Sequence, residues 1–181
     1  VELAGHFLKQ YNIRGSIPVG KKVIVVGGGN AAIDAARTAV RLGAEVSIIY
    51  RRTQEQMPAY AEEIEEALLE GVTLMTLTQP IEVVKTTDDK VKGLKCMKMT
   101  LGDFDRSGRR RAKESEEETF VLDADQIIVA IGQRIEPKRL FGDSEIKIGA
   151  NGFIITDPVT GQTSEDWIFA GGDAALGPAS V

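Results

Sequence analysis

The sequence has few of the residues on which redox-active thiol sites and metal sites depend. Its 181 residues include one cysteine, Cys96, and one histidine, His6. A single thiol excludes an internal disulfide, a CxxC redox pair and a cysteine-ligated iron–sulfur cluster within this chain. We expect Cys96 to be a small packed residue and His6, which has no partner at ligand spacing, to bind no metal.

Long apolar runs and an excess of positive charge are also missing. No segment reaches the length needed to span a bilayer, and the first residues, VELAGHFLKQYN, lack the basic region and apolar core of a secretory signal. The formal net charge is −5, so the surface as a whole should not attract nucleic acid. We therefore expect a cytoplasmic protein that binds neither membranes nor nucleic acid, and any anion must be held by a local arrangement.

The first half of the chain alternates strand-like and helix-like segments. Apolar β-branched runs are typical of strands buried on both faces, and apolar residues at helical spacing indicate amphipathic helices. Pro58 before the second helix and Gly71 after it fit the usual asymmetry of helix ends. The pattern predicts a βαβαβ unit with strands at 23–26, 45–50 and 72–77 and helices at 31–42 and 59–71.

The second half changes character. Short β-like runs separated by polar turns predict an antiparallel β-meander inserted at about residues 80–125, with a hairpin turn at TTDDK. The basic triplet at 109–111 could bind a phosphate, but the acidic run beside it favours a solvated, self-compensated loop. A buried strand at 126–132 returns to the sheet, and FIIT (153–156) and WIFA (167–170) are also predicted to be strands.

Residues 27–32, GGGNAA, fit a GxGxxA pattern between a buried strand and an amphipathic helix. In that position Gly27 allows a tight turn, Gly29 lets a pyrophosphate approach the backbone, and Ala32 lets helix and strand pack closely. The helix N-terminus adds free N–H groups and a positive dipole end, and Asn30 is expected to cap the helix. The alternatives are a glycine turn that only starts a helix, or a site for a single phosphate or a methyl donor.

The end of the second strand indicates which dinucleotide would bind. An acidic residue there would accept hydrogen bonds from a ribose 2′-hydroxyl, whereas arginine suits a 2′-phosphate. The sequence has Arg51 and Arg52, and its next carboxylate is Glu55, so it favours NADP(H) over NAD(H). Tyr50 could stack near the adenine or fill the strand end. Asp34 and Arg37 are expected to form only a surface pair.

At this point the sequence resembles a known family. The run at 27–72, with YRRTQEQMPA after its second strand, looks like the NADPH-binding segment of the glutamate synthase small-subunit family of FAD and iron–sulfur oxidoreductases. IIVAIGQRIEP resembles the strand that closes that domain, and residues 152–181 resemble the return of the chain to a flavin domain. The resemblance implies hydride transfer from NADPH to FAD and then electron transfer to iron–sulfur clusters. It also implies a partner subunit or a ferredoxin-like acceptor.

The resemblance also assigns site residues, all of them to cofactor binding. Residues 27–31 are expected to hold the pyrophosphate, and Arg51 and Arg52 the 2′-phosphate. Gly132 is expected on the nicotinamide side, and Gly172 with Asp173 at the flavin. No catalytic residue or metal ligand is assigned. The complete set is Gly27, Gly28, Gly29, Asn30, Ala31, Arg51, Arg52, Gly132, Gly172 and Asp173.

Three parts follow from this interpretation. Residues 1–20 form a lead-in helix and connector, residues 21–150 a Rossmann-like NADP(H)-binding domain, and residues 151–181 a truncated return segment towards the FAD domain. The chain has no second GxGxxG for the FAD adenosine and no cysteine cluster. We expect a segment of a longer polypeptide that binds NADPH and is inactive alone. The alternatives are a related ferredoxin:NADP or dihydropyrimidine dehydrogenase-type reductase domain, a nucleotide-sensing module, or a methyltransferase, which would prefer an acidic second-strand end.

Overall fold

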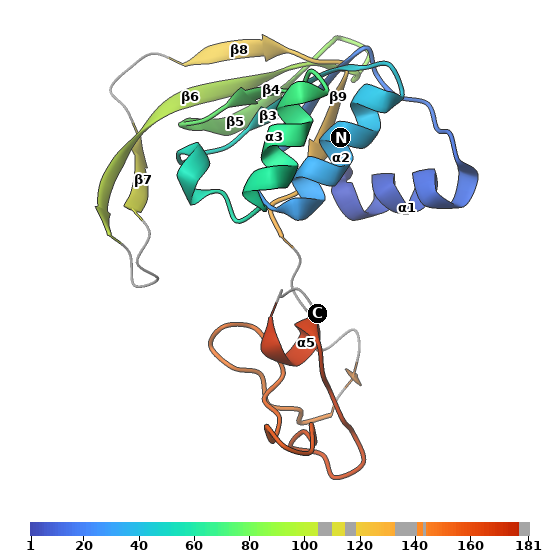
Figure 1. Cartoon of the computed structure of the whole chain (residues 1–181), viewed down its shortest axis with the longest axis vertical. Coiled ribbons are helices and arrows are strands. Elements are labelled where there is room, and N and C mark those ends of the chain that lie inside the picture. The colour runs from blue at the N-terminus through green and yellow to red at the C-terminus, as the bar shows by residue number, and fades with distance from the viewer. Residues whose placement is uncertain (105–109, 115–118, 133–140, 143, 178–181) are drawn as a thin grey trace. The chain divides into compact units, whose positions relative to one another are not determined.

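A computed structural model describes residues 1–104, 110–114, 119–132, 141–142 and 144–177 of the chain (Figure 1). The basic residue Arg109 lies outside this described part. The chain divides into two compact units, residues 1–132 and residues 133–181, and each is considered by itself. The three-part division expected from the sequence stays a prediction.

The first unit is built on a five-stranded sheet in which every described strand pair is parallel. Its spatial order is β1-β9-β2-β3-β4, so the predicted βαβαβ unit supplies one side and the returning strand β9 the other. The short edge strand β1 was not predicted, because two residues carry no periodicity. The strands are β1 (Glu2–Leu3), β2 (Lys22–Val26), β3 (Glu45–Ile49), β4 (Thr73–Met75) and β9 (Gln126–Val129).

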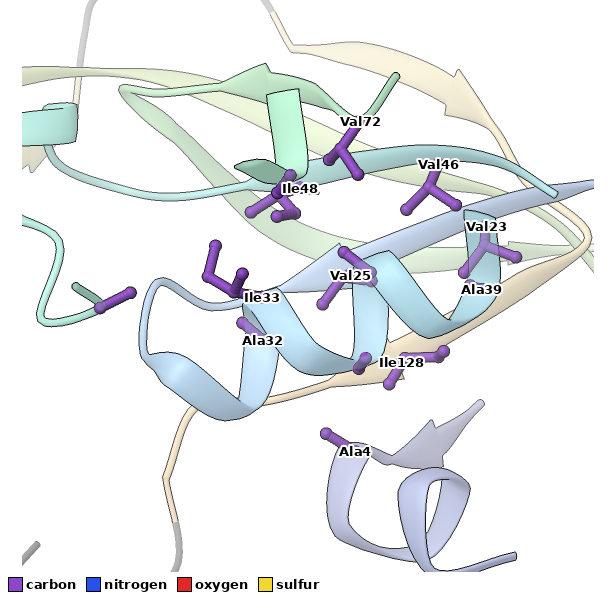
Figure 2. Packing of buried hydrophobic residues seen from close by; sticks show 14 of the residues in the cluster. Ala4, Val23, Val25, Ala32, Ile33, Ala39, Val46, Ile48, Val72 and Ile128 are labelled. Atoms are coloured by element: carbon purple, nitrogen blue, oxygen red, sulfur yellow. The ribbon is translucent and has the colours of Figure 1, made fainter. Parts of the chain in front are cut away.

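Helices cover one face of this sheet. They are α1 (Ala4–Arg14), α2 (Asn30–Arg41) and α3 (Ala61–Leu69), with a 3-10 turn η1 (Gln54–Gln56) before α3. Figure 2 shows side chains of α2 lying against those of β2 and β3. Four alanines of α2 are completely buried, so the helix packs close to the strands; they are Ala32, Ala35, Ala36 and Ala39. This close packing is what a short residue at Ala32 was expected to allow, and Ala32 is 0% exposed.

An antiparallel sheet covers the other face. It contains β5 (Thr78–Lys85), β6 (Val91–Phe104), β7 (Arg110–Glu114) and β8 (Phe120–Asp123), and it confirms the predicted meander. Alternate residues of β2 explain the three layers, since Val25 faces the helices and Ile24 faces this second sheet. Cys96 is fully buried in the second layer, and burial raises the pKa of its thiol to about 11. The expectation of a small packed cysteine is confirmed.

The second unit has little regular structure among its described residues. Its helix α5 spans Asp173–Leu176, and the predicted strands at 153–156 and 167–170 are wrong. Each of these runs makes one isolated bridge, Ile148 with Ile154 and Gln162 with Phe169. An apolar run becomes a strand only where a neighbour supplies a continuous ladder of hydrogen bonds, and these runs have a single bridge each. None of the described helices has the length and apolarity that a membrane crossing requires.

An ion-pair network joins α2 to α3. The Arg37 guanidinium donates to Glu70 at 3.0 and 2.8 Å and also pairs with Glu63 and Glu66, while Arg41 pairs with Glu70 at 2.6 Å. The expected pair of Asp34 with Arg37 is therefore wrong. Arg37 lies on the side of α2 that faces α3, where three glutamates recur at helical spacing.

This network generates a pH-dependent stability. Hydrogen bonds from Arg37 and, to a smaller extent, from Arg41 hold the pKa of Glu70 below its ordinary value of 4.5. A carboxyl whose pKa is lowered on folding stabilises the fold above its unfolded pKa and loses that contribution as the pH falls through the folded pKa. We expect Arg37→Met to lower the free energy of unfolding by about 1–2 kcal/mol near pH 7.

The measurement is urea unfolding of the wild type and the variant from pH 7 to pH 3. The difference in the free energy of unfolding between the two proteins should shrink as the pH falls below about 4.5, because Glu70 becomes protonated in both. Arg14→Met, on the exposed end of α1, is the matched control and should change little at any pH. A difference between wild type and Arg37→Met that is constant with pH would contradict the proposed ionic origin.

Candidate functional site

The order of the parallel strands creates a crevice at one place on the sheet. The chain runs outward from β2 to β3 and β4, then returns to place β9 on the other side of β2. Open parallel sheets bind ligands outside the carboxyl ends of the strands at such a reversal. Here the reversal lies between β2 and β9, where the Ala130 amide donates to the Val26 carbonyl at 2.8 Å. The glycine loop, residues 27–31, begins at this point.

At Gly27 the ends of β2 and β9 approach each other too closely for a side chain to fit between them. Gly27 has a φ of +144°, and a Cβ built on it would lie 2.3 Å from the Ala130 carbonyl oxygen. Its own amide donates to the Ile49 carbonyl at 3.1 Å, so the turn is bonded to β3 as well. Both the backbone angle and the lack of space require glycine at this position. Gly27 therefore serves the fold of the loop directly.

Gly28 is required for a different reason. A Cβ at this position would lie 2.6 Å from the ring of Tyr50, which is 9% exposed and packs beneath the loop. The Tyr50 hydroxyl donates to the Gln56 carbonyl at 2.8 Å. Tyr50 thus supports the glycine loop from the end of β3. This resolves the alternative left open by the sequence in favour of a tyrosine that fills the strand end.

Gly29 differs from both of its neighbours. Its φ of −94° and ψ of 174° suit any residue, and the nearest atom to a built Cβ is Pro58 Cγ at 3.9 Å. The folded protein therefore leaves space beside Gly29 that it does not use for its own packing. This open space is consistent with close approach of a ligand to the backbone, as the GxGxxA pattern predicts.

Asn30 does not cap the helix, so that expectation is wrong. Gly29 occupies the cap position without a side-chain bond, and Asn30 is the first helical residue. Its side-chain oxygen instead accepts a hydrogen bond from the Tyr60 amide at 3.1 Å. The Ala59 amide donates to the Gly28 carbonyl at 3.1 Å. The segment at 58–60 therefore fastens the loop, a role that periodicity could not reveal.

The amides of the loop form a potential anion site. Within the described part of the chain, the N–H groups of residues 28–31 donate to no protein acceptor, whereas those of Ala32 and Ile33 donate to the Gly29 carbonyl. These free donors lie at the N-terminus of the 12-residue helix α2, where the helix dipole adds partial positive charge. Free amides, a positive helix end and open space beside Gly29 can together hold a phosphate or pyrophosphate group.

The two arginines after β3 lie in different environments. Arg51 is exposed, whereas Arg52 is 9% exposed and its Nε donates to the Arg110 carbonyl at 3.0 Å. The Arg52 carbonyl accepts from the Leu77 amide at 3.0 Å, so its backbone is held as well. Arg51 is thus the more accessible of the two cations next to the glycine loop, and Arg52 is a fixed one.

The other expected site residues lie in two places. Gly132 follows β9 by three residues, on the same edge of the sheet as the glycine loop, with φ of +102° and open space around it. Gly172 and Asp173 lie in the second unit at the start of α5, and both are exposed. Their assignments to the nicotinamide and to the flavin stay predictions. The described residues contain no cluster of His, Cys, Asp or Glu suited to a metal ion.

Comparison with known proteins places this geometry in a family. The model of a family described as pyridine nucleotide-disulphide oxidoreductase matches residues 5–181. The chain is 45% identical over 163 residues to the NADP(+)-dependent formate dehydrogenase subunit beta of Moorella thermoacetica, covering 90% of this chain and 23% of that protein. It is 36% identical to the glutamate synthase [NADPH] small chain of Escherichia coli K12, covering 87% of this chain and 34% of that protein.

Solved structures show the same fold. FprA of Mycobacterium tuberculosis in complex with NADPH superimposes with a TM-score of 0.73 at 20% identity, over 99% of this chain and 54% of that one. The thioredoxin reductase of T. acidophilum superimposes with a TM-score of 0.64 at 23% identity, over 87% of this chain and 45% of that one. The chain thus spans about half of each of these structures and a smaller share of the curated relatives that it matches.

The contrast between Gly27 and Gly29 generates a test of the loop geometry. We expect Gly27→Ala to lower the free energy of unfolding by at least about 2 kcal/mol, because the new Cβ meets a backbone carbonyl at a positive φ. Gly29→Ala should cost about 1 kcal/mol or less, as expected for alanine at a helix cap. Chemical denaturation of both variants measures the difference, and equal costs would contradict the assigned roles.

Proposed function

Because the chain belongs to the pyridine nucleotide-disulphide oxidoreductase family, we propose that its first unit binds NADP(H) across the carboxyl edge of the parallel sheet. The observation that carries the proposal is the open space at Gly29 beside the unpaired amides of residues 28–31. A pyrophosphate fits that combination, because it accepts several hydrogen bonds and its charge complements the helix dipole. The nicotinamide would extend towards β9 and Gly132, and the adenosine towards β3.

The adenosine end of the proposed site carries the arginine pair, Arg51 and Arg52. Its exposed member, Arg51, supplies the first contact with the 2′-phosphate. Arg52 completes the site from a fixed position, because its Nε–H group donates a hydrogen bond to the Arg110 carbonyl. A guanidinium matches phosphate geometry and keeps its charge at every physiological pH. NADP(H) is therefore preferred to NAD(H) in this proposal.

We further propose that the full protein transfers a hydride between NADP(H) and FAD and passes electrons to iron–sulfur clusters. When bound, NADPH supplies the hydride and FAD accepts it, while this chain orients the nicotinamide. The relatives named above are a beta subunit and a small chain of larger enzymes, which supports a partner subunit. Gly172 and Asp173 are the residues of this chain assigned to the flavin, and such a role distinguishes the proposal from a nucleotide-sensing module.

The type of complex has two candidates. The resemblance noted from the sequence favours a glutamate synthase small chain, and the E. coli relative carries that name. The 45% identity to an NADP(+)-dependent formate dehydrogenase beta subunit favours a formate-oxidising complex. Both candidates use the same dinucleotide chemistry in this unit, so the binding site proposed here is common to them.

Substitution of Gly29 tests where the pyrophosphate binds. Gly29→Ala should raise the Kd for NADPH and for NADH alike, by about tenfold or more, because its methyl group fills the space that both dinucleotides need. Calorimetric titration gives the two constants, and the small stability cost expected for this variant separates binding from folding. Unchanged affinity for both dinucleotides would place the pyrophosphate elsewhere.

Substitution of Arg51 tests the phosphate preference separately. Arg51→Ala should weaken NADPH binding by about 10- to 100-fold, the usual loss for one charge-assisted contact, and leave NADH binding unchanged. Arg14→Ala on α1 removes the same charge at a distance and serves as the control. If the wild type bound NADPH and NADH equally, the proposed role of the arginine pair would be wrong.

A further inference from the structure

We propose that the hairpin of β6 and β7 forms part of the nucleotide site and that Arg111 is a third cation for the 2′-phosphate. The inference rests on the proposed function and deepens it. The sequence favoured a solvated loop for the basic triplet at 109–111, because acidic residues follow it. The structure brings the Arg110 carbonyl of this triplet to Arg52, which is 58 residues away in the sequence.

Several backbone contacts tie the antiparallel sheet to the end of β3. The Thr78 amide donates to the Tyr50 carbonyl at 3.0 Å, and the Leu77 amide donates to the Arg52 carbonyl at 3.0 Å. The Met99 amide of β6 in turn donates to the Leu77 carbonyl at 2.8 Å. Leu77 has φ of +48°, an unusual value for a residue with a branched side chain. These contacts hold β6 beside the arginine pair, and β7 follows β6.

The bond from Arg52 Nε to the Arg110 carbonyl then places β7 itself. In Figure 1, β7 lies beside the segment that joins β3 to α3, as this 3.0 Å contact requires. The side chain of Arg110 does not reach outward, because its Nε donates to the Gly102 carbonyl at 3.0 Å and its Nη2 to the Leu101 carbonyl at 3.2 Å. Arg110 therefore stiffens the hairpin and presents its carbonyl to Arg52.

Arg111 is the residue that this arrangement leaves available. It follows the carbonyl bound by Arg52 directly, and its side chain lies on the opposite face of β7 from that of Arg110. It is exposed, and its side chain makes no hydrogen bond or ion pair with any described residue. Lys113, on the same face of β7, differs from Arg111 because its Nζ lies 3.8 Å from a carboxylate oxygen of Asp103. The backbone of Arg111 is thus fixed beside the proposed phosphate site, while its guanidinium is exposed and available to bind an anion.

The charge of the chain makes this grouping informative. The protein carries a net charge of −5, yet the two arginines at the end of β3, Arg51 and Arg52, lie next to the strand that carries Arg111. A 2′-phosphate carries close to two negative charges at neutral pH and three acceptor oxygens, so it can be bound by more than one guanidinium.

The test is competitive binding of 2′,5′-ADP and 5′-AMP against NADPH, together with direct titration of NADPH and NADH, on the full 181-residue chain. Arg111→Ala should weaken NADPH and 2′,5′-ADP by roughly 5- to 50-fold and leave NADH and 5′-AMP unchanged. Arg111→Lys should restore part of the affinity, because it keeps the charge without the planar fork. Lys92→Ala, at the distant start of β6, is the matched control, and thermal unfolding of each variant monitors the fold.

The outcomes separate the two proposals. If the wild type prefers NADPH and Arg51→Ala abolishes the preference while Arg111→Ala does not alter it, the hairpin inference is overturned and the proposed function stands. If the wild type has no preference for NADPH over NADH, both the proposed 2′-phosphate site at Arg51 and Arg52 and the inferred role of Arg111 are wrong. An equal loss for NADPH and NADH in Arg111→Ala would also overturn the inference, because it would indicate a structural role.

Discussion

The close contact between Gly27 and the Ala130 carbonyl is the constraint on which the site depends. It joins the end of β2 to the end of β9, where the strand order of the parallel sheet reverses. A side chain at residue 27 would separate these strand ends, and the backbone could not turn into α2 from the same position. The direction in which α2 leaves the sheet, and therefore the direction of its free amides, follows from this contact.

The end of β3 is a second organising point, because it connects three layers. The Tyr50 ring packs against the glycine loop. The carbonyls of Tyr50 and Arg52 accept hydrogen bonds from the amides at the start of the antiparallel sheet, and the Arg52 side chain donates to the backbone of β7. The run after β3 that carries the family resemblance therefore combines several structural functions in a few residues. Its Pro58–Tyr60 segment returns to bind the glycine loop as well.

The sequence could predict features that depend on local pattern. The βαβαβ order, the inserted meander, the buried Cys96 and the packing role of Ala32 all follow from periodicity, turn residues or size. It could not predict features that depend on partners distant in the chain. From the sequence Asn30 is expected to be a helix cap, but in the structure its side chain accepts a hydrogen bond from the Tyr60 amide. Likewise Arg37 forms its ion pairs with residues of α3 and not with Asp34. Two apolar runs near the C-terminus resemble strands, but among the described residues they find only single bridges.

The three consecutive glycines illustrate the same limit at the level of one motif. The GxGxxA pattern assigns Gly27 to a tight turn and Gly29 to the pyrophosphate but gives Gly28 no role of its own. In the structure Gly27 is required by its backbone angle and Gly28 by the ring of Tyr50, whereas nothing in the folded chain requires Gly29. At this N-cap position Asn, Asp or Ser would bond the free amides of the first helical turn, whereas Gly29 bonds none of them. A glycine here leaves both the amides and the space beside them open, as the proposed binding of a pyrophosphate requires.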